Sequence, residues 1–192
     1  MKKKLILLFG ILLFIGCKTE KRTNNINTSE FPEVNDEFQD FINQFPEIKL
    51  PLLLKDGQNN FGGLKKLNET KYLSNQNESI YILGKIKTSG NYLALICLVE
   101  SEGLLPIVTT FKLNGEKIQS TNFMIGLCGP DECFECGEVF KIDNKLNVSI
   151  EHHSYYFECN ENGINKDKRT NEKRIIKNGF IEKNGVIKLL NE

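Results

Sequence analysis

The sequence predicts a mainly β fold, an antiparallel β-meander of roughly eight strands with one short N-terminal helix. From Ile48 onward, apolar and polar residues alternate with a period of two, which is typical of half-buried strands. Asn-Gly pairs, which favour tight hairpin turns, stand among these alternating stretches. The connections are too short for the crossover helices of a parallel sheet. The strands could form an open sheet, an open barrel or a sandwich.

The chain begins with a short apolar run that follows three lysines. A helix over residues 5–16 would be about 18 Å long, whereas the hydrocarbon core of a bilayer is about 30 Å thick. This run is therefore too short to span a membrane. Positive charge, a short apolar run and a small residue before the cleavage point together indicate a secretory signal peptide.

The end of this run, Phe14-Ile15-Gly16-Cys17, resembles the lipobox of bacterial lipoproteins. The resemblance implies that the peptide is cut after Gly16, that the Cys17 thiol carries a diacylglyceryl group, and that the new amino terminus is acylated, for example with palmitate. Two or three acyl chains hold a protein at a membrane, since each buried methylene contributes about 0.8 kcal/mol. The alternatives are an uncleaved signal anchor and an ordinary signal peptide with an incidental cysteine.

The predicted organisation is a signal peptide over residues 1–16, lipidated Cys17 with a flexible tether over residues 17–30, and a single β-rich domain over residues 31–192. The tether is polar and would reach about 40 Å at roughly 3.3 Å per residue. Loss of the signal peptide leaves 22 basic and 25 acidic residues, a net charge of −3. This balance disfavours nucleic acid as a partner, because such binding needs clustered positive charge.

The predicted helix begins at Asp36, which has capping-box spacing to Gln39, and ends before Pro46. Its apolar side chains recur at three- and four-residue intervals, as expected for a face that packs in the core. They are Val34, Phe38, Phe41, Ile42 and Phe45.

The first strands follow this helix. Residues 48–55 are predicted to place Ile48, Leu50, Leu52 and Leu54 on one side of a strand. Residues 79–87 are predicted to do the same with Ile80, Ile82 and Ile86. The stretch 91–100, "NYLALICLVE", is apolar on both faces, which predicts a central strand covered on both sides.

Three Asn-Gly pairs mark the expected hairpins of the remaining strands: Asn114-Gly115, Asn178-Gly179 and Asn184-Gly185. Together with the lipobox, the tether and the phenylalanine-rich helix entry, the hairpin "TFKLNGEKI" gives a layout that resembles small uncharacterised lipoproteins of Bacteroidota. The resemblance implies a lipid-anchored cell-envelope location, at the outer membrane on its periplasmic or surface face, and a β-rich fold. It implies no catalytic residues.

The cysteines are the one constellation with evident chemistry. Cys128, Cys133 and Cys136 lie close together, and Cys159 follows 23 residues later. The spacing matches that of the cysteines that hold the iron–sulfur cluster in plant-type ferredoxins. An iron–sulfur cluster is disfavoured, however, because a lipoprotein crosses the membrane unfolded, before a cluster could be inserted. Four thiolates could instead hold zinc in a tetrahedral site. Eight acids and only two lysines between Cys128 and Glu161 disfavour thiolates, since nearby negative charge raises a thiol pKa.

Disulfides in an oxidising compartment are the favoured interpretation of these cysteines. Four cysteines allow three connectivities. A Cys133–Cys136 bond would close a very small ring, so we favour Cys128 and Cys159 each pairing with one of these two. Cys97, within an apolar strand, is predicted to be a core residue.

The remaining polar patterns are weaker. His152 and His153 are the only histidines, and as neighbours in a strand they point to opposite faces and cannot hold one metal together. His152 is expected to be a partly buried imidazole with a satisfied hydrogen bond. Residues 165–188 carry eight basic residues and three acids, which is typical of a lysine-protected edge hairpin or of a partner surface.

No catalytic constellation emerges, so the favoured hypothesis is a lipid-anchored, non-enzymatic binding module. It would bind an envelope protein or other envelope component through one sheet face or the cysteine loop. The alternative is a zinc-binding or thiol-redox envelope protein that uses Cys128, Cys133, Cys136 and Cys159. A hydrolase of envelope polymers is a third hypothesis, for which no residues can be named.

Overall fold

The computed structural model describes residues 35–55, 63–68, 71–73, 79–100, 104–123, 125, 132–161 and 163–190. These residues belong to one compact unit, Pro32–Glu192. The predicted signal peptide, Cys17, the tether, Val34 and Cys128 lie outside the described residues.

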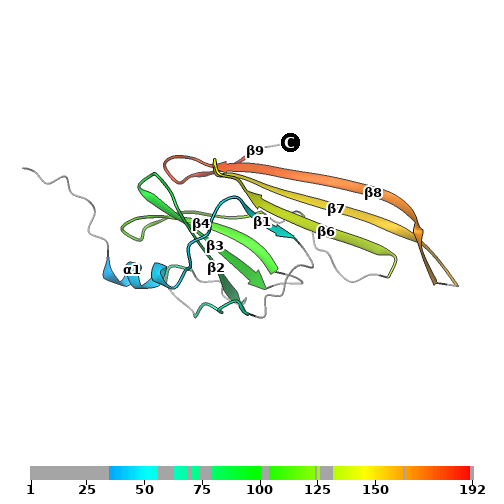
Figure 1. Cartoon of the computed structure of the whole chain (residues 1–192), viewed down its shortest axis with the longest axis horizontal. Coiled ribbons are helices and arrows are strands. Elements are labelled where there is room, and N and C mark those ends of the chain that lie inside the picture. Colours follow the sequence, from blue (N-terminus) through cyan, green and yellow to red (C-terminus); the bar gives the residue numbers. More distant parts are fainter. Residues whose placement is uncertain are drawn as a thin grey trace, which may run out of the picture. The chain divides into compact units, whose positions relative to one another are not determined.

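The described residues form two antiparallel sheets with nine strands and one short helix, which confirms the mainly β prediction (Figure 1). One sheet has the strand order β2-β3-β4-β5, and the other has the order β1-β6-β7-β8-β9. The elements are α1 (Asp36–Asn43), β1 (Leu52–Lys55), β2 (Ile80–Lys87), β3 (Tyr92–Glu100), β4 (Leu104–Lys112), β5 (Lys117–Asn122), β6 (Phe134–Ile142), β7 (Asn147–Asn160), β8 (Gly163–Ile181) and β9 (Ile187–Leu190).

β3 is buried on both faces, as predicted. Its residues Tyr92, Ala94 and Ile96 belong to the core between the two sheets. The alternate residues Leu93, Leu95 and Cys97 belong to a second core on the opposite face of the four-stranded sheet, where α1 packs. Only Glu100, at the end of the strand, is exposed.

The α1 helix begins one residue earlier than a capping box at Asp36 implies. Asn35 is the N-cap, and its side chain accepts a hydrogen bond from the Glu37 backbone N–H at 3.0 Å. Asp36 is therefore the first helical residue, and the prediction that it caps the helix was wrong because the neighbouring Asn takes that role. The predicted aromatic face is confirmed: Phe38 and Phe41 are buried, and the Phe38 ring centroid lies 5.4 Å from that of Phe111.

Residues 47–55 cross from one sheet to the other instead of forming one strand. Glu47 forms a bridge with Lys85 of β2, whereas β1 pairs with β6 in the second sheet. The Leu50–Pro51 peptide bond between these two pairings is cis. The predicted apolar side holds, because Ile48, Leu50, Leu52 and Leu54 all pack against the core between the sheets.

A β-bulge in β2 overturns the prediction that Ile80, Ile82 and Ile86 share one side. The register to β3 shifts between Ile82 and Gly84. Ile80 and Ile82 pack on the α1 side of the sheet, whereas Ile86 lies in the core between the sheets. One extra residue reverses the alternation of side chains beyond the bulge.

Two of the three predicted Asn-Gly turns are confirmed. Gly115 and Gly185 have φ angles of +90° and +86° in the β4–β5 and β8–β9 turns. Asn178 and Gly179 instead lie inside β8, so that prediction was wrong. Gly179 pairs with both Val148 and Leu189, and a Cβ atom there would lie 2.6 Å from the Lys188 carbonyl oxygen. Close approach of the backbones explains this glycine.

Hydrogen bonds join the two sheets along one side. The Gln119 side chain of β5 accepts from the Ile187 backbone N–H at 2.9 Å and donates to the Ile187 carbonyl at 3.1 Å. The buried Thr110 hydroxyl donates to the Gly185 carbonyl at 2.7 Å. These bonds attach β9 and its turn to the four-stranded sheet.

We predict that Gly84→Ala destabilises the protein. A Cβ at this position would lie 2.6 Å from both the Pro46 carbonyl oxygen and Ile48 Cγ1. The crossing segment would have to move, and overpacking of this kind costs about 1–3 kcal/mol. Chemical denaturation measures the loss, with Gly63→Ala as the control, because a Cβ at Gly63 has no neighbour within 4 Å. Equal stabilities of the two variants would contradict this account of the crossing.

Candidate functional site

A disulfide joins the start of β6 to the end of β7. The Cys133 and Cys159 sulfurs are 2.03 Å apart. The Phe157 backbone N–H donates to the Cys133 carbonyl at 2.7 Å beside this bond. The pairing is one of those that the sequence favoured, because it joins Cys159 to one member of the Cys133/Cys136 pair.

Cys136 is disulfide-bonded as well. Since Cys133 and Cys159 are bonded to each other and Cys97 is free, the partner of Cys136 lies outside the described residues. A sulfur in a disulfide is not a thiolate and cannot serve as a zinc ligand in the predicted four-cysteine site. Within the described ranges, no group of three or more His, Cys, Asp or Glu side chains is placed to hold a metal ion.

Cys97 is a free thiol in the core, as the sequence predicted. It is 4% exposed, and burial raises the pKa of its thiol to about 12. A protonated, buried thiol is a poor nucleophile. Cys97 therefore packs as an apolar residue at neutral pH.

Beside Cys97, on the α1 side of the four-stranded sheet, lies a pocket of about 250 Å³. Ile80, Val99 and Ile107 form much of its apolar lining. Its polar side includes the Thr109 and Ser120 hydroxyls, whose oxygens are 2.8 Å apart. Sequence reasoning missed this pocket, because its lining comes from four strands and the loop residue Leu73. Its mostly apolar lining suits a small apolar group.

The two histidines lie on opposite faces of β7, as predicted. His152 is buried, and its Nδ1 is 3.2 Å from the buried Glu138 carboxylate across the β6–β7 pair. The Ile125 backbone N–H donates to the same carboxylate oxygen at 3.3 Å. The His153 ring lies over Gly137, where a Cβ would be 2.9 Å from the ring. The prediction that His152 is a partly buried imidazole with a hydrogen-bond partner is confirmed.

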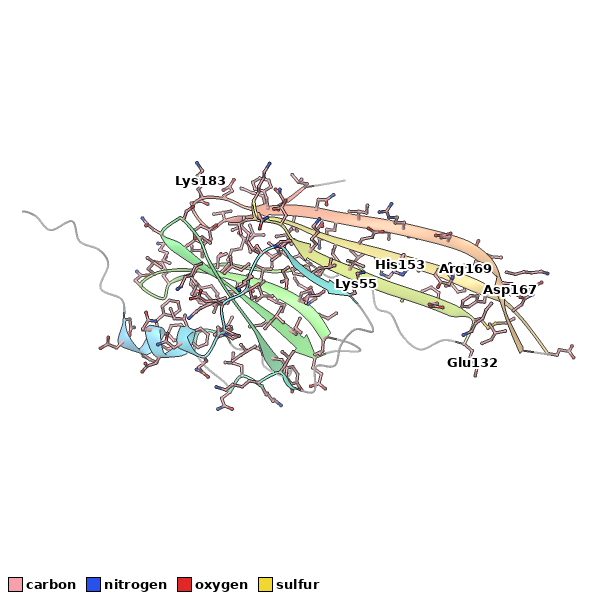
Figure 2. All side chains as sticks on the ribbon, in the orientation of Figure 1. Lys55, Glu132, His153, Asp167, Arg169 and Lys183 are labelled. Atoms are coloured by element: carbon pink, nitrogen blue, oxygen red, sulfur yellow. A yellow bond between two sulfur atoms is a disulfide. The ribbon has the colours of Figure 1, made fainter. Side chains whose placement is uncertain are left out.

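Beyond these histidines, β6, β7 and β8 continue past the four-stranded sheet (Figure 1). We call this part the arm and define it as Phe134–Glu138, His152–Asn160 and Gly163–Ile175. In Figure 2, Asp167, Arg169 and Glu132 lie toward its far end, whereas Lys183 lies at the other end of the second sheet. Every residue from Lys166 to Arg174 is exposed. Side chains on both faces of β8 are therefore exposed at these positions, whereas Tyr155 and Phe157 of the neighbouring β7 are buried.

Aromatic side chains lie on both faces of the arm, and a cation contacts one of them. The Arg169 guanidinium lies 4.3 Å from the Tyr155 ring centroid, within the range of a cation–π contact. On the other face, the Phe134 and Tyr156 ring centroids are 4.9 Å apart, and Tyr156 is 46% exposed. Tyr155 is itself buried, so the exposed aromatic of the arm is Tyr156, and aromatic residues and arginine are both enriched in binding surfaces.

The basic residues of β8 are only partly neutralised. The Arg174 guanidinium donates two hydrogen bonds to Glu151, which lowers the pKa of that carboxyl group. Lys168 pairs with Glu158 at 2.8 Å. Lys166, Lys173 and Lys177 form no ion pair within the part of the chain that the structure describes. The charge excess noted in the sequence is thus gathered on one strand.

β8 is also an edge strand along most of its length. β9 pairs only with Asn178–Ile181, so no described strand pairs with the outer side of residues 163–177. The sequence suggested an edge hairpin protected by lysines in this region. The structure gives a single 19-residue strand, far longer than the short strands expected.

The chain matches no family model, and no curated protein or solved structure is significantly similar to it. The resemblance to Bacteroidota lipoproteins therefore stays a prediction. No described helix has the length and hydropathy of a membrane-spanning segment.

We predict that the double variant Cys133→Ser/Cys159→Ser loosens the end of the arm. The disulfide closes a loop between positions 26 residues apart, and such a bond stabilises a protein by about 2–4 kcal/mol. Hydrogen exchange should accelerate most at Phe157 and its neighbours, and the inter-sheet core should keep its protection. Uniform acceleration throughout both sheets would contradict a local role.

We predict that the Cys97 thiol reacts only when the protein unfolds. The unfolded thiol ionises near pH 8.5, whereas the folded thiol stays protonated to about pH 12. Stability from this burial is complete below about pH 8.5 and declines as the pH rises toward 12. Iodoacetamide at pH 8.5, followed by mass spectrometry, should therefore modify Cys97 in denaturant and leave it unmodified in the native protein. Rapid native labelling would contradict this prediction.

Proposed function

We propose that the protein is a lipid-anchored, non-enzymatic binding module of the cell envelope and that the arm is its binding part. The observation that carries the proposal is the exposure of β8 from Lys166 to Arg174 on both faces. A domain that needs these strands only for stability would cover one face with a second layer. The arm instead offers cations, aromatic rings and an open strand edge to a partner.

The envelope location rests on the sequence of residues 1–17 and agrees with the cysteine chemistry. Disulfides form and persist in compartments outside the cytosol. The Cys133–Cys159 bond joins strand ends of the arm, where solvent reaches Cys159. The predicted tether of residues 17–30 would give the domain freedom to meet a partner away from the lipid surface.

Binding is favoured over chemistry by the kinds of groups that the arm presents. Its charged side chains form exposed pairs, such as Lys168–Glu158, or remain without an ion pair in the described part, such as Lys173. Its one buried titratable pair, Glu138–His152, lies at the base of the arm with both side chains about nine-tenths buried. A substrate in solvent does not reach that pair.

Site-specific photo-crosslinking in the native host tests the proposal. A p-benzoylphenylalanine residue in place of Lys173 should give a discrete adduct with an envelope component. The same residue in place of the exposed Lys183, at the other end of the second sheet, should give none. With Cys17→Ser, the protein should leave the membrane fraction and the adduct should weaken.

Adducts of equal yield at positions 173 and 183 would contradict the assignment of the arm. An unmodified Cys17 in the native protein, found by mass spectrometry, would contradict the lipid anchor.

A further inference from the structure

The outer edges of β1, β2, β5 and β9 differ from that of β8. Bridges, side-chain hydrogen bonds or short length leave these strands with few unpaired backbone groups. β2 is flanked by the bridges Glu47–Lys85 and Lys66–Tyr81. β5 and β9 are joined by the two hydrogen bonds between Gln119 and Ile187. β1 is only four residues long. No described strand pairs with the outer side of β8 over residues 163–177, whereas natural proteins usually cover or shorten an edge of this length.

The hydrogen bonds of β8 show which backbone groups face this open edge. The Ile181 backbone N–H donates to the Leu146 carbonyl at 3.1 Å, on the β7 side. In an antiparallel strand, the N–H and C=O groups of successive residues point alternately to one neighbouring strand and to the other. The register of β8 to β7 is unbroken from Phe180 to Lys173, so this alternation continues along these residues. The N–H and C=O groups of Ile176 and Arg174 therefore point away from β7, toward the open edge.

The side chains around these groups define what could pair with them. Residues 173–177 read Lys-Arg-Ile-Ile-Lys, two apolar residues between cations. Residues directly opposite each other on neighbouring strands interact, and opposite charges stabilise the pair. An antiparallel partner strand would thus match this edge with two central apolar residues and acidic residues on both sides.

A second copy of this chain is a poor occupant of the edge. If two β8 edges paired as antiparallel strands, Lys173 of one copy would lie near Lys177 of the other. Like charges opposite each other destabilise a sheet. Lysines on an edge strand are a common means of preventing such self-association.

We propose that the edge of β8 at residues 173–177 receives an extended acidic segment of a partner protein as an added antiparallel strand. Backbone hydrogen bonds to Arg174 and Ile176 supply affinity, and Lys173 and Lys177 select acidic residues. This inference rests on the proposed function, because it names how β8 binds where the arm, which ends at Ile175, continues into Ile176 and Lys177.

The test uses the purified full chain and a labelled synthetic peptide with the core Glu-Val-Val-Glu-Glu. Read antiparallel to residues 177–173, this core places glutamates opposite the three cations and valines opposite the two isoleucines. Fluorescence anisotropy should show saturable binding that weakens with added salt. A peptide with N-methyl groups on the amides that face β8 should bind at least tenfold more weakly. A Lys-Val-Val-Lys-Lys peptide should not bind at the same concentrations.

The protein variant Lys173→Glu/Lys177→Glu should lose at least tenfold in affinity for the acidic peptide and gain affinity for the basic one. The matched control, Lys145→Glu/Lys183→Glu, makes the same change of charge at exposed turn residues and should bind as the wild type does. Bound peptide should slow hydrogen exchange at the Arg174 and Ile176 amides, an effect that charge attraction alone would not produce.

The proposal is overturned if the N-methylated peptide binds as tightly as its parent or if exchange at Arg174 and Ile176 is unchanged. It is also overturned if the protein dimerises at micromolar concentration through β8, or if vesicles of phosphatidylglycerol bind the chain while the acidic peptide does not. Failure here with intact crosslinking at position 173 would leave the proposed function standing, because only the mode of binding would be wrong.

Discussion

The burial of β3 on both faces is the constraint on which the rest of the structure depends. One face of this strand supplies the core between the sheets and the other supplies the core beneath α1. A strand covered twice must be apolar at consecutive positions, as "YLALICLV" is. The short helix and the five-stranded sheet are then two separate covers of one central strand.

This layering limits where the second sheet can be covered. Its inner face is apolar where β6, β7 and β8 lie over the four-stranded sheet, with Phe140 and Ile150 in the shared core. The Glu138–His152 pair follows along the same face, and the exposed aromatic Tyr156 comes after it. Along this face, buried apolar residues give way to a buried polar pair and then to an exposed residue. This change marks where the two packed sheets end and the arm begins. The arm is thus held by its own strand pairing, with the Cys133–Cys159 disulfide near its end.

The edges of the two sheets are protected in different ways. The four-stranded sheet and β9 use bridges and the Gln119 side chain to limit their open backbone groups. No described segment pairs with β8 over residues 163–177, and this edge carries lysines, which discourage pairing with a second copy. The proposed acidic strand would use the same edge. One set of charges can therefore serve both solubility and selection of a partner. The lipid anchor expected from residues 1–17 would place this edge within reach of other envelope components.

The sequence by itself determined the features that depend on local chemistry. Alternation predicted the β fold, consecutive apolar residues predicted the central strand, and glycine in left-handed turns predicted two of the hairpins. It also determined the disulfide chemistry and the core position of Cys97, because spacing and neighbouring residues limit what cysteines can do.

Only the tertiary structure decided the rest, because that depends on which strands meet. The β2 bulge turns Ile86 to the other face, and a single extra residue leaves no clear signal in an alternating pattern. Gly179 proved to serve a close backbone contact with β9 instead of a turn, a distinction that needs the neighbouring strand. Among the described residues, β9 pairs only with the last residues of β8, and this pairing defines the arm and its edge. The basic residues of β8 were visible in the sequence, but their place on an unpaired edge depends on hydrogen bonds between distant segments.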